Sequence, residues 1–397
     1  MKTRLLLFII AAFSLTLSAQ KKAEPAKEGY NFTSVVSLKA TPVKNQSSTG
    51  ICWCFATTSF IESELLRMGK GEYDLSEMFI VRNNYIRRLR DNYLRRGNGN
   101  LGQGSLSHNW FKVFADEGIV PDQVYNGLGY GSPTHSHGEL NAMLEAVAGV
   151  PVKRKVASPE YNEIVESILD IYLGEVPESF EYKGTRYTPK TFAESLGINA
   201  SDYVEITSFS HFPFYTRGVL EVPDNWMHER FYNVPLNELI EIMDHALMNG
   251  YTVNWDGDVS EKGFSHTNGV AIVPDVVNTD NYSTTDRARF EKMPQADRLE
   301  EVFRFTRPYP EMVITQENRQ TGYETFVTTD DHLMHLTGIV KDQNGTKYYV
   351  TKNSWGTERN RFGGYLNMSE SFVKAKTIFI MVHKDAIPGP IRAKLGL

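Results

Sequence analysis

Two cysteines separated by one tryptophan are the residues with the clearest capacity for chemistry. The chain has only these two, Cys52 and Cys54. A disulfide between residues i and i+2 would be badly strained, so we expect both thiols to be free. A deprotonated thiol is a nucleophile or a metal ligand, but Cys-x-Cys is not a usual zinc spacing. The pattern favours a nucleophile over the alternative of two small buried apolar residues.

The residues around Cys52 suggest how its thiol would be activated. Gly and Ser/Thr residues precede it, and apolar residues follow it at helical spacing: Phe55, Ala56, Phe60, Ile61 and Leu65. This pattern predicts a buried helix that begins at Cys52, where free backbone N–H groups and the helix dipole stabilise a thiolate. Gln46 lies six residues upstream. Its side-chain amide and the backbone amide of Cys52 are candidates for an oxyanion hole.

A thiolate mechanism also needs a base and a group that orients the base. His332 and Asn353 lie on two strand-like segments that residues 342–345 join, and the Asn-Gly pair in this turn is a strong hairpin signal. The hairpin would bring the two side chains into hydrogen-bonding reach, with Trp355 placed to shield their bond from water. His335 is a second candidate base, but on a strand it would face the opposite way from His332.

Three motifs in this order resemble the papain superfamily of cysteine peptidases. They are Gln-x₃-Gly-x-Cys-Trp ending at Trp53, Asp-His-x₅-Gly containing His332, and Asn-Ser-Trp-Gly beginning at Asn353. The resemblance implies that His332 is the catalytic base and His335 an ordinary side chain. The separation of Cys52 and His332 is 332 − 52 = 280 residues, against roughly 130–150 in ordinary papain-like enzymes. Such insertions are typical of bleomycin hydrolases and bacterial aminopeptidase C, which segments 111–121, 222–235 and 250–274 also resemble.

The resemblance implies an α+β, papain-like two-lobe fold with insertions, in which a helical lobe faces an antiparallel, β-barrel-like lobe. The predicted divisions are a signal peptide (1–19), an N-terminal arm (20–40), a helical lobe with the cysteine helix and an insertion (41–205), a β-rich lobe with His332 and Asn353 (206–385), and a C-terminal arm (386–397). The active site would lie in the cleft between the lobes.

The first nineteen residues have the layout of a secretory signal peptide. Lys2 and Arg4 precede a largely apolar run, which ends at the small residues Ser18 and Ala19. The run is too short for a membrane span, and the alternative is an N-terminal core helix. We therefore expect an exported protein, periplasmic or secreted, with no membrane attachment after signal cleavage.

Composition and short motifs restrict the partners. Charged residues make up 23% of the chain and form no long run of one sign, which argues against nucleic-acid binding. His135 and His137 form a His-x-His pair that has too few ligands for a metal, and Asp256-Gly257-Asp258 lacks the remaining ligands of a calcium loop. We expect no metal and no cofactor, and peptides as substrates.

These inferences predict an exported cysteine aminopeptidase that works through an acyl-enzyme. A papain-like endopeptidase is one alternative, and an inactive papain-like binding protein is another. In the bleomycin hydrolase group a C-terminal arm enters the cleft and its carboxylate meets the substrate amine, which makes Leu397 a candidate here. Pro388 and Pro390 predict an extended arm rather than a helix. The group also implies a homohexamer. Gly102 and Gly104 either allow close approach of substrate backbone or form a flexible loop.

Overall fold

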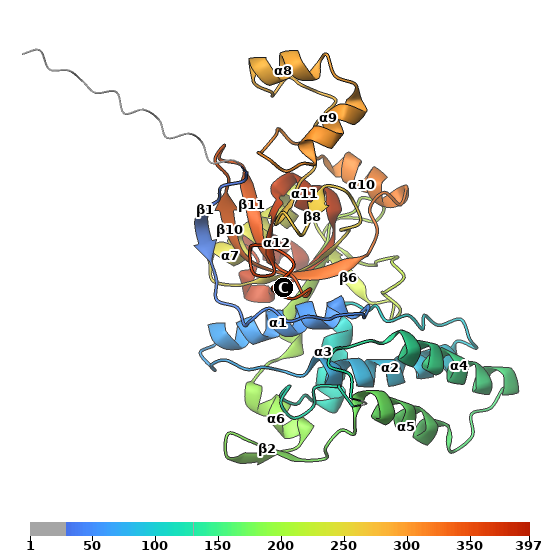
Figure 1. Cartoon of the computed structure of the whole chain (residues 1–397). Coiled ribbons are helices and arrows are strands. Elements are labelled where there is room, and N and C mark those ends of the chain that lie inside the picture. Colours follow the sequence, from blue (N-terminus) through green and yellow to red (C-terminus); the bar gives the residue numbers. More distant parts are fainter. Residues whose placement is uncertain (1–28, 130) are drawn as a thin grey trace, which may run out of the picture.

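The computed structural model describes residues 29–129 and 131–397, and it divides into a lobe of helices and a lobe built on a sheet (Figure 1). The predicted signal peptide and the first part of the N-terminal arm lie outside these residues. The helices are α1 Cys52–Arg67, α2 Glu77–Leu94, α3 Ser107–Glu117, α4 Gly138–Arg154, α5 Tyr161–Leu173, α6 Pro189–Leu196, α7 Leu236–Met248, α8 Thr284–Phe290, α9 Gln295–Val302, α10 Gln316–Glu324, α11 Glu370–Lys376 and α12 Gly389–Leu395.

The second lobe is organised by an 11-stranded sheet, counted over the described residues. Its strands are β1 Thr33–Ser37, β4 Tyr203–Thr207, β5 Arg217–Val219, β6 Arg230–Asn233, β7 Val253–Gly257, β8 Phe264–Ser265, β9 Val270–Ala271, β10 His332–Lys341, β11 Lys347–Lys352, β12 Tyr365–Ser369 and β13 Thr377–His383. The order is β5-β6-β4-β13-β7-β10-β11-β12-β9-β8, and β1 pairs with β10. Only the β4–β6 and β9–β12 pairs are parallel. A separate hairpin joins β2 Phe180–Tyr182 to β3 Thr185–Tyr187.

Helix α1 lies at the junction of the two lobes (Figure 1). Its residues from Cys52 to Leu65 are all buried, as expected for a helix that is covered on every side. On one side it packs against α2 and α3 in the core of the helical lobe, and on the other it contacts β10 and β7. This double contact places the first turn of α1 directly beside the start of β10.

The hairpin predicted from the Asn-Gly pair is present. Strand β10 pairs antiparallel with β11, and the turn between them is held by Asp342, whose Oδ1 accepts the backbone N–H groups of Asn344 and Thr346. The hairpin fixes the spacing between His332, the first residue of β10, and Asn353, which directly follows β11. Two residues that are far apart along the strands therefore meet across the sheet.

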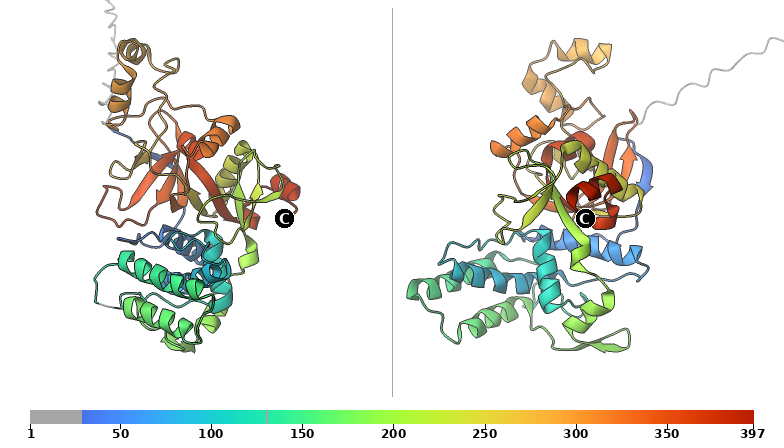
Figure 2. Two further views of the ribbon diagram at one scale, coloured as in Figure 1. Left: turned by 90° about the vertical axis from the view of Figure 1, so that its right-hand side faces the viewer. Right: turned by 180° about the vertical axis from the view of Figure 1, so that it is seen from behind.

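Long connections add further helices and a hairpin to the two lobes. The predicted insertion in residues 155–205 contains α5, the β2–β3 hairpin and α6. A second excursion, which the sequence analysis did not anticipate, carries α8 and α9 away from the sheet lobe, as Figures 1 and 2 show. Its helices are short: α8 has seven residues and α9 has eight.

The structure differs from the expected organisation in three segments. Part of the N-terminal arm is strand β1, which pairs with β10. The sheet lobe begins at Tyr203, the first residue of β4, rather than at residue 206. The C-terminal arm is not extended, because α12 spans Gly389–Leu395 with Pro390 in its first turn, where a missing N–H costs nothing. In the described ranges no helix is long and apolar enough to cross a membrane.

Candidate active site

The predicted nucleophile begins helix α1. Cys52 is free, as is Cys54, so no disulfide joins them. The N-cap residue is Ile51, whose apolar side chain offers no acceptor to the first-turn N–H groups, and this leaves their positive ends available near the sulfur. Burial raises the pKa of Cys52 to about 12, while backbone N–H groups of Trp53 and Leu333 donate to the sulfur and oppose that rise. The thiol thus needs a proton acceptor to become reactive at neutral pH.

His332 and Asn353 meet as predicted. Nε2 of His332 lies 2.8 Å from Oδ1 of Asn353, and both side chains are buried. The backbone N–H of Ser354 donates to the same Oδ1 at 2.7 Å, which fixes the orientation of the amide. An acceptor at Oδ1 keeps the imidazole proton on Nε2 and leaves Nδ1 unprotonated. Burial lowers the pKa of His332 to about 4, so its imidazole is unprotonated at neutral pH and Nδ1 is free to accept a proton.

Cys52 and His332 both lie where the start of α1 meets the start of β10. Leu333, whose backbone N–H donates to the sulfur of Cys52, directly follows His332 in β10. The start of this strand therefore supplies both a hydrogen bond to the nucleophile and the adjacent base. The arrangement suits a thiol that transfers its proton to imidazole.

Trp355 covers the bond between histidine and asparagine. Its ring centroid lies 4.9 Å from that of His332. A further histidine, His266, packs 5.1 Å from Trp355, and its Nδ1 lies 3.4 Å from Nδ2 of Asn353. The sequence analysis missed His266 because no motif or spacing connects it with Asn353, from which it lies 87 residues away. Its contact holds the second side of the orienting amide.

Three hydrogen bonds fix Gln46, the predicted oxyanion donor. Its Oε1 accepts a 2.6 Å hydrogen bond from the hydroxyl of Ser354, and one N–H of Nε2 donates to the carbonyl of Thr49 at 2.8 Å. The backbone N–H of Gln46 also donates to the carbonyl of Ser354 at 2.8 Å. These contacts leave the second N–H of Nε2 for a ligand. Ser354, which the sequence analysis did not assign, thereby orients the predicted donor.

Gly102 and Gly104 lie beside the loop that precedes Cys52, which we call the cysteine loop, but their surroundings differ. Gln103, between them, accepts the N–H of Gly50 through Oε1 at 2.8 Å, and its carbonyl accepts Nε1 of Trp53 at 3.0 Å. A Cβ on Gly104 would lie 1.9 Å from Oδ2 of Asp224. Gly104 is therefore required by the close approach of a carboxylate, which neither predicted alternative included.

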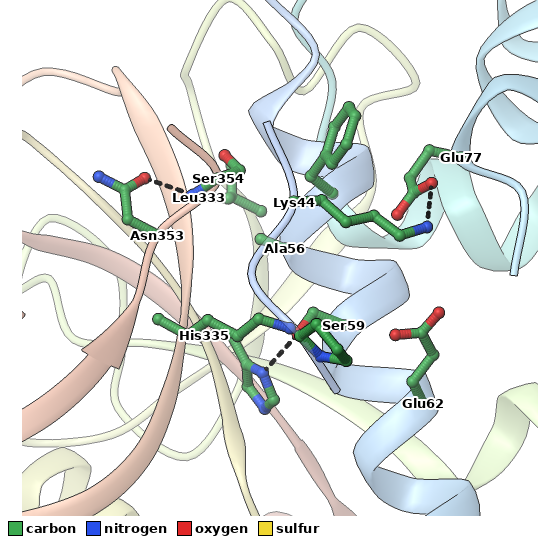
Figure 3. Close-up of a pocket in the computed structure, with 12 residues that line it drawn as sticks. Lys44, Ala56, Ser59, Glu62, Glu77, Leu333, His335, Asn353 and Ser354 are labelled. Atoms are coloured by element: carbon green, nitrogen blue, oxygen red, sulfur yellow. Dashed lines mark hydrogen bonds and ion pairs between the residues drawn. The ribbon is translucent and has the colours of Figure 1, made fainter. Parts of the chain in front are cut away.

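His335 has a structural role and is not part of the catalytic pair. Its Nδ1 lies 2.9 Å from the hydroxyl of Ser59, which in turn accepts a 2.7 Å hydrogen bond from Nζ of Lys352. Figure 3 shows His335 and Ser59 facing one another between β10 and α1. Burial lowers the pKa of Lys352 to about 8. This polar contact joins the lobes behind the catalytic residues.

Leu397 does not lie with the catalytic residues. It lines a pocket with His108, Tyr203 and Glu205, and its backbone N–H donates to the carbonyl of Arg392. Helix α12 holds the chain end there, because Ile391 and Leu395 are buried in the core of the sheet lobe. The structure thus separates Leu397 from the site for which the sequence proposed it.

Two of the four candidate metal ligands, His137 and Asp258, make other hydrogen bonds, while Nδ1 of His135 and both oxygens of Asp256 have no hydrogen-bond partner among the described residues. Nδ1 of His137 lies 3.2 Å from the hydroxyl of Tyr85. Asp258 accepts hydrogen bonds from the backbone and hydroxyl of Ser260, while Asp256 lies in strand β7. Among the described residues, no group of three or more His, Cys, Asp or Glu side chains is arranged to hold a metal ion.

Comparison with known proteins finds similarity to cysteine peptidases. Residues 31–225 match the papain family cysteine protease, a match that includes Gln46 and Cys52 and ends before His332. Aminopeptidase C of Lactococcus lactis subsp. cremoris is 23% identical over 89% of this chain and 83% of its own length. Cysteine proteinase A of Leishmania mexicana is 29% identical, but the match spans only 28% of this chain and 30% of that protein.

The fold is shared with a solved structure. The crystal structure of PepW from Lactobacillus rhamnosis HN001 superposes with a TM-score of 0.65 at 18% identity, over 92% of this chain and 84% of that one. The fold and the site therefore define a papain-like cysteine peptidase, which confirms the predicted α+β class. Within that class, residues 31–225 match the papain family cysteine protease, and most of the chain is similar to aminopeptidase C of Lactococcus lactis.

Proposed function

We propose that this protein is an exported aminopeptidase that hydrolyses peptide bonds through Cys52, His332 and Asn353. The observation that carries the proposal is the 2.8 Å contact between His332 and Asn353 at the start of β10, beside the sulfur of Cys52. Similarity to aminopeptidase C over most of the chain supports action at the amino terminus of peptides. Export rests on the signal-like residues 1–19.

The reaction follows from the positions of these groups. Nδ1 of His332 accepts the thiol proton, and the Cys52 sulfur attacks the peptide carbonyl. The resulting oxyanion receives N–H groups from Nε2 of Gln46 and from the backbone of Cys52. Protonated His332 then gives its proton to the departing amine, and afterwards activates the water that hydrolyses the thioester. Asn353 keeps the ring in place throughout.

Two other functions fit the same fold. A papain-like endopeptidase would use the same catalytic residues but accept blocked peptides. An inactive binding protein would retain the fold without a reactive thiol. Both differ from the proposal in measurable behaviour.

Two measurements test the proposal. A thiol-directed epoxide should label wild-type protein irreversibly and leave Cys52→Ala unlabelled; no labelling of wild type would favour the inactive binder. Amide substrates should then be compared with a free and with an N-acetylated amino terminus. Faster cleavage of the free-amine substrate is expected. Equal cleavage of both would support the endopeptidase instead.

A further inference from the structure

Three acidic side chains, of which Asp256 is fully buried and Asp224 and Asp330 are half-buried, lie near the nucleophile. They come from separate parts of the chain: Asp224 precedes β6, Asp256 lies in β7, and Asp330 lies two residues before β10. In the β7–β10 register Asp256 is directly opposite Leu333, whose backbone N–H donates to the Cys52 sulfur. Cross-strand neighbours point to the same face of a sheet, so Asp256 lies on the face that meets α1.

The carboxyl group of Asp256 has no compensating donor. The residue is 0% exposed, and neither of its oxygens has a hydrogen-bond donor among the residues that the structure describes. A neighbouring group is another carboxyl, that of Asp330, whose Oδ2 is likewise buried without a donor among the described residues. Burying a carboxylate without a partner is costly, so a pocket of this kind is suited to receive a cation.

The electrostatic effects show that the three groups and the thiol lie close together. Burial raises the pKa of Asp256 well above its usual range, and the charges of Asp330, Cys52 and Asp224 add to the rise. Burial, with the charges of Asp224 and Asp331, raises the pKa of Asp330 to about 8. The pKa of Asp224 is raised by burial, against the opposing charge of Arg88.

We propose that Asp224, Asp256 and Asp330 form the site that receives the free α-ammonium group of the substrate residue whose carbonyl Cys52 attacks. The proposal rests on the aminopeptidase function proposed above. The α-nitrogen is two covalent bonds from the attacked carbonyl carbon, so it must lie near the sulfur, as this acidic cluster does. Asp224 lies against Gly104, which leaves room for its carboxylate at the cysteine loop.

The acidic cluster supplies the negative charge that the sequence analysis assigned to the carboxylate of Leu397. The chain end lines a different pocket, with Glu205 and Tyr203, so its carboxylate does not meet a substrate beside Cys52. The side chains of the cluster supply negative charge at that position instead. Asp330 is half-buried, whereas Asp256 is fully buried.

The test compares three fluorogenic amides that share the residue before the scissile bond. One has a free α-amine, one is N-acetylated, and one carries an acetyl-lysyl extension whose ammonium is on a side chain. The ratio of kcat/KM for the free to the acetylated substrate should fall about 30-fold or more in Asp256→Asn and in Asp330→Asn. Asp280→Asn, which removes an exposed carboxylate, should keep the wild-type ratio.

Each outcome decides between explanations. Variants that keep the ratio, or lose both substrates equally, would overturn the assignment while leaving the aminopeptidase function intact. A wild-type enzyme that cleaves free and acetylated substrates equally would instead overturn the proposed function. Selective loss of the acetyl-lysyl substrate would assign the cluster to a side-chain ammonium and overturn the α-ammonium site. Should Asp256→Asn fail to fold, the half-buried Asp330 provides the deciding variant.

Proton release provides a second readout that a structural role would not produce. Three adjacent carboxyl groups cannot all ionise in the empty site, so an arriving ammonium ion should displace a proton to the buffer. Calorimetry of Cys52→Ala with a free-amine dipeptide amide, in two buffers of different ionisation enthalpy, should detect that proton. The release should be reduced when Asp330→Asn is added, and binding without proton release would contradict the proposal.

Discussion

The hydroxyl of Ser354 lies 2.6 Å from Oε1 of Gln46, and this hydrogen bond connects the sheet lobe to the loop that precedes Cys52. Ser354 directly follows Asn353, and its backbone N–H donates to the Oδ1 that orients His332. One residue therefore supports both the orienting amide and the oxyanion donor. The relative positions of base and oxyanion hole depend on the same short segment after β11.

Gln46→Ala should lower kcat by about 10²–10³-fold, because one of the two proposed oxyanion donors is lost. Ser354→Ala should cost less, since the Gln46 amide remains but is free to turn. Steady-state kinetics on one free-amine substrate would measure both. In the double variant, the Ser354 change should add little, because its effect acts through Gln46. Fully additive losses would contradict this coupling.

Asn353→Ala should lower kcat/KM by about 10²-fold, because the imidazole of His332 would no longer be fixed toward Cys52. Asn353→Gln should restore part of the activity if its longer amide reaches Nε2. Thermal denaturation would show whether either variant loses stability. Wild-type kinetics in a folded Asn353→Ala protein would remove Asn353 from the mechanism.

The pH dependence of Cys52 alkylation should depend on His332. Burial lowers the pKa of His332 to about 4, so wild-type reactivity should rise as pH increases through this value and the imidazole becomes able to accept the proton. In His332→Ala the thiol must ionise alone, with a pKa that burial raises to about 12. Its rate should then be low at neutral pH and increase about tenfold per pH unit in alkali.

Iodoacetamide labelling followed by mass spectrometry would measure these rates. Cys52→Ala is the control, because Cys54 is fully buried and its sulfur donates to the carbonyl of Glu77. Superimposable profiles for wild type and His332→Ala would show that His332 is not the base.

Lys352 should make stability increase with pH in alkali. Burial lowers its pKa from the ordinary 10.5 to about 8, so the unfolded chain binds more protons than the folded one between these values. The free energy of unfolding should therefore rise by about 3 kcal/mol across this window through Lys352. Urea denaturation at pH 7 and pH 10 should show this rise in wild type and its loss in Lys352→Met. Lys341→Met, at an exposed position, is the control. Parallel changes in all three proteins would contradict the assignment.

The position of Leu397 predicts that the chain end is not needed for recognition of the substrate amine. Adding Gly-Ser after Leu397 moves the terminal carboxylate but leaves the buried Ile391 and Leu395 in place. The preference for free-amine over N-acetylated substrates should be unchanged. Loss of that preference alone would return the terminal carboxylate to the active site.

The sequence by itself determined the local elements of the site. The apolar spacing after Cys52 predicted a helix that begins at the nucleophile, and the Asn-Gly turn predicted the hairpin that joins His332 to Asn353. Both signals are short in range, because helical and strand periodicity and turn chemistry are written within a few residues. The motifs then identified which histidine to choose, and the structure places His332 beside Asn353 and His335 beside Ser59.

Only the tertiary structure decided which distant side chains join these elements. Asp256 appeared in the sequence as part of an incomplete calcium loop, yet strand pairing places it opposite Leu333. His266 reaches Asn353 in the same way, through the packing of separate strands. The chain end forms a helix because Ile391 and Leu395 find an apolar surface to cover. Such contacts depend on burial and register across more than fifty residues, and no local pattern encodes them.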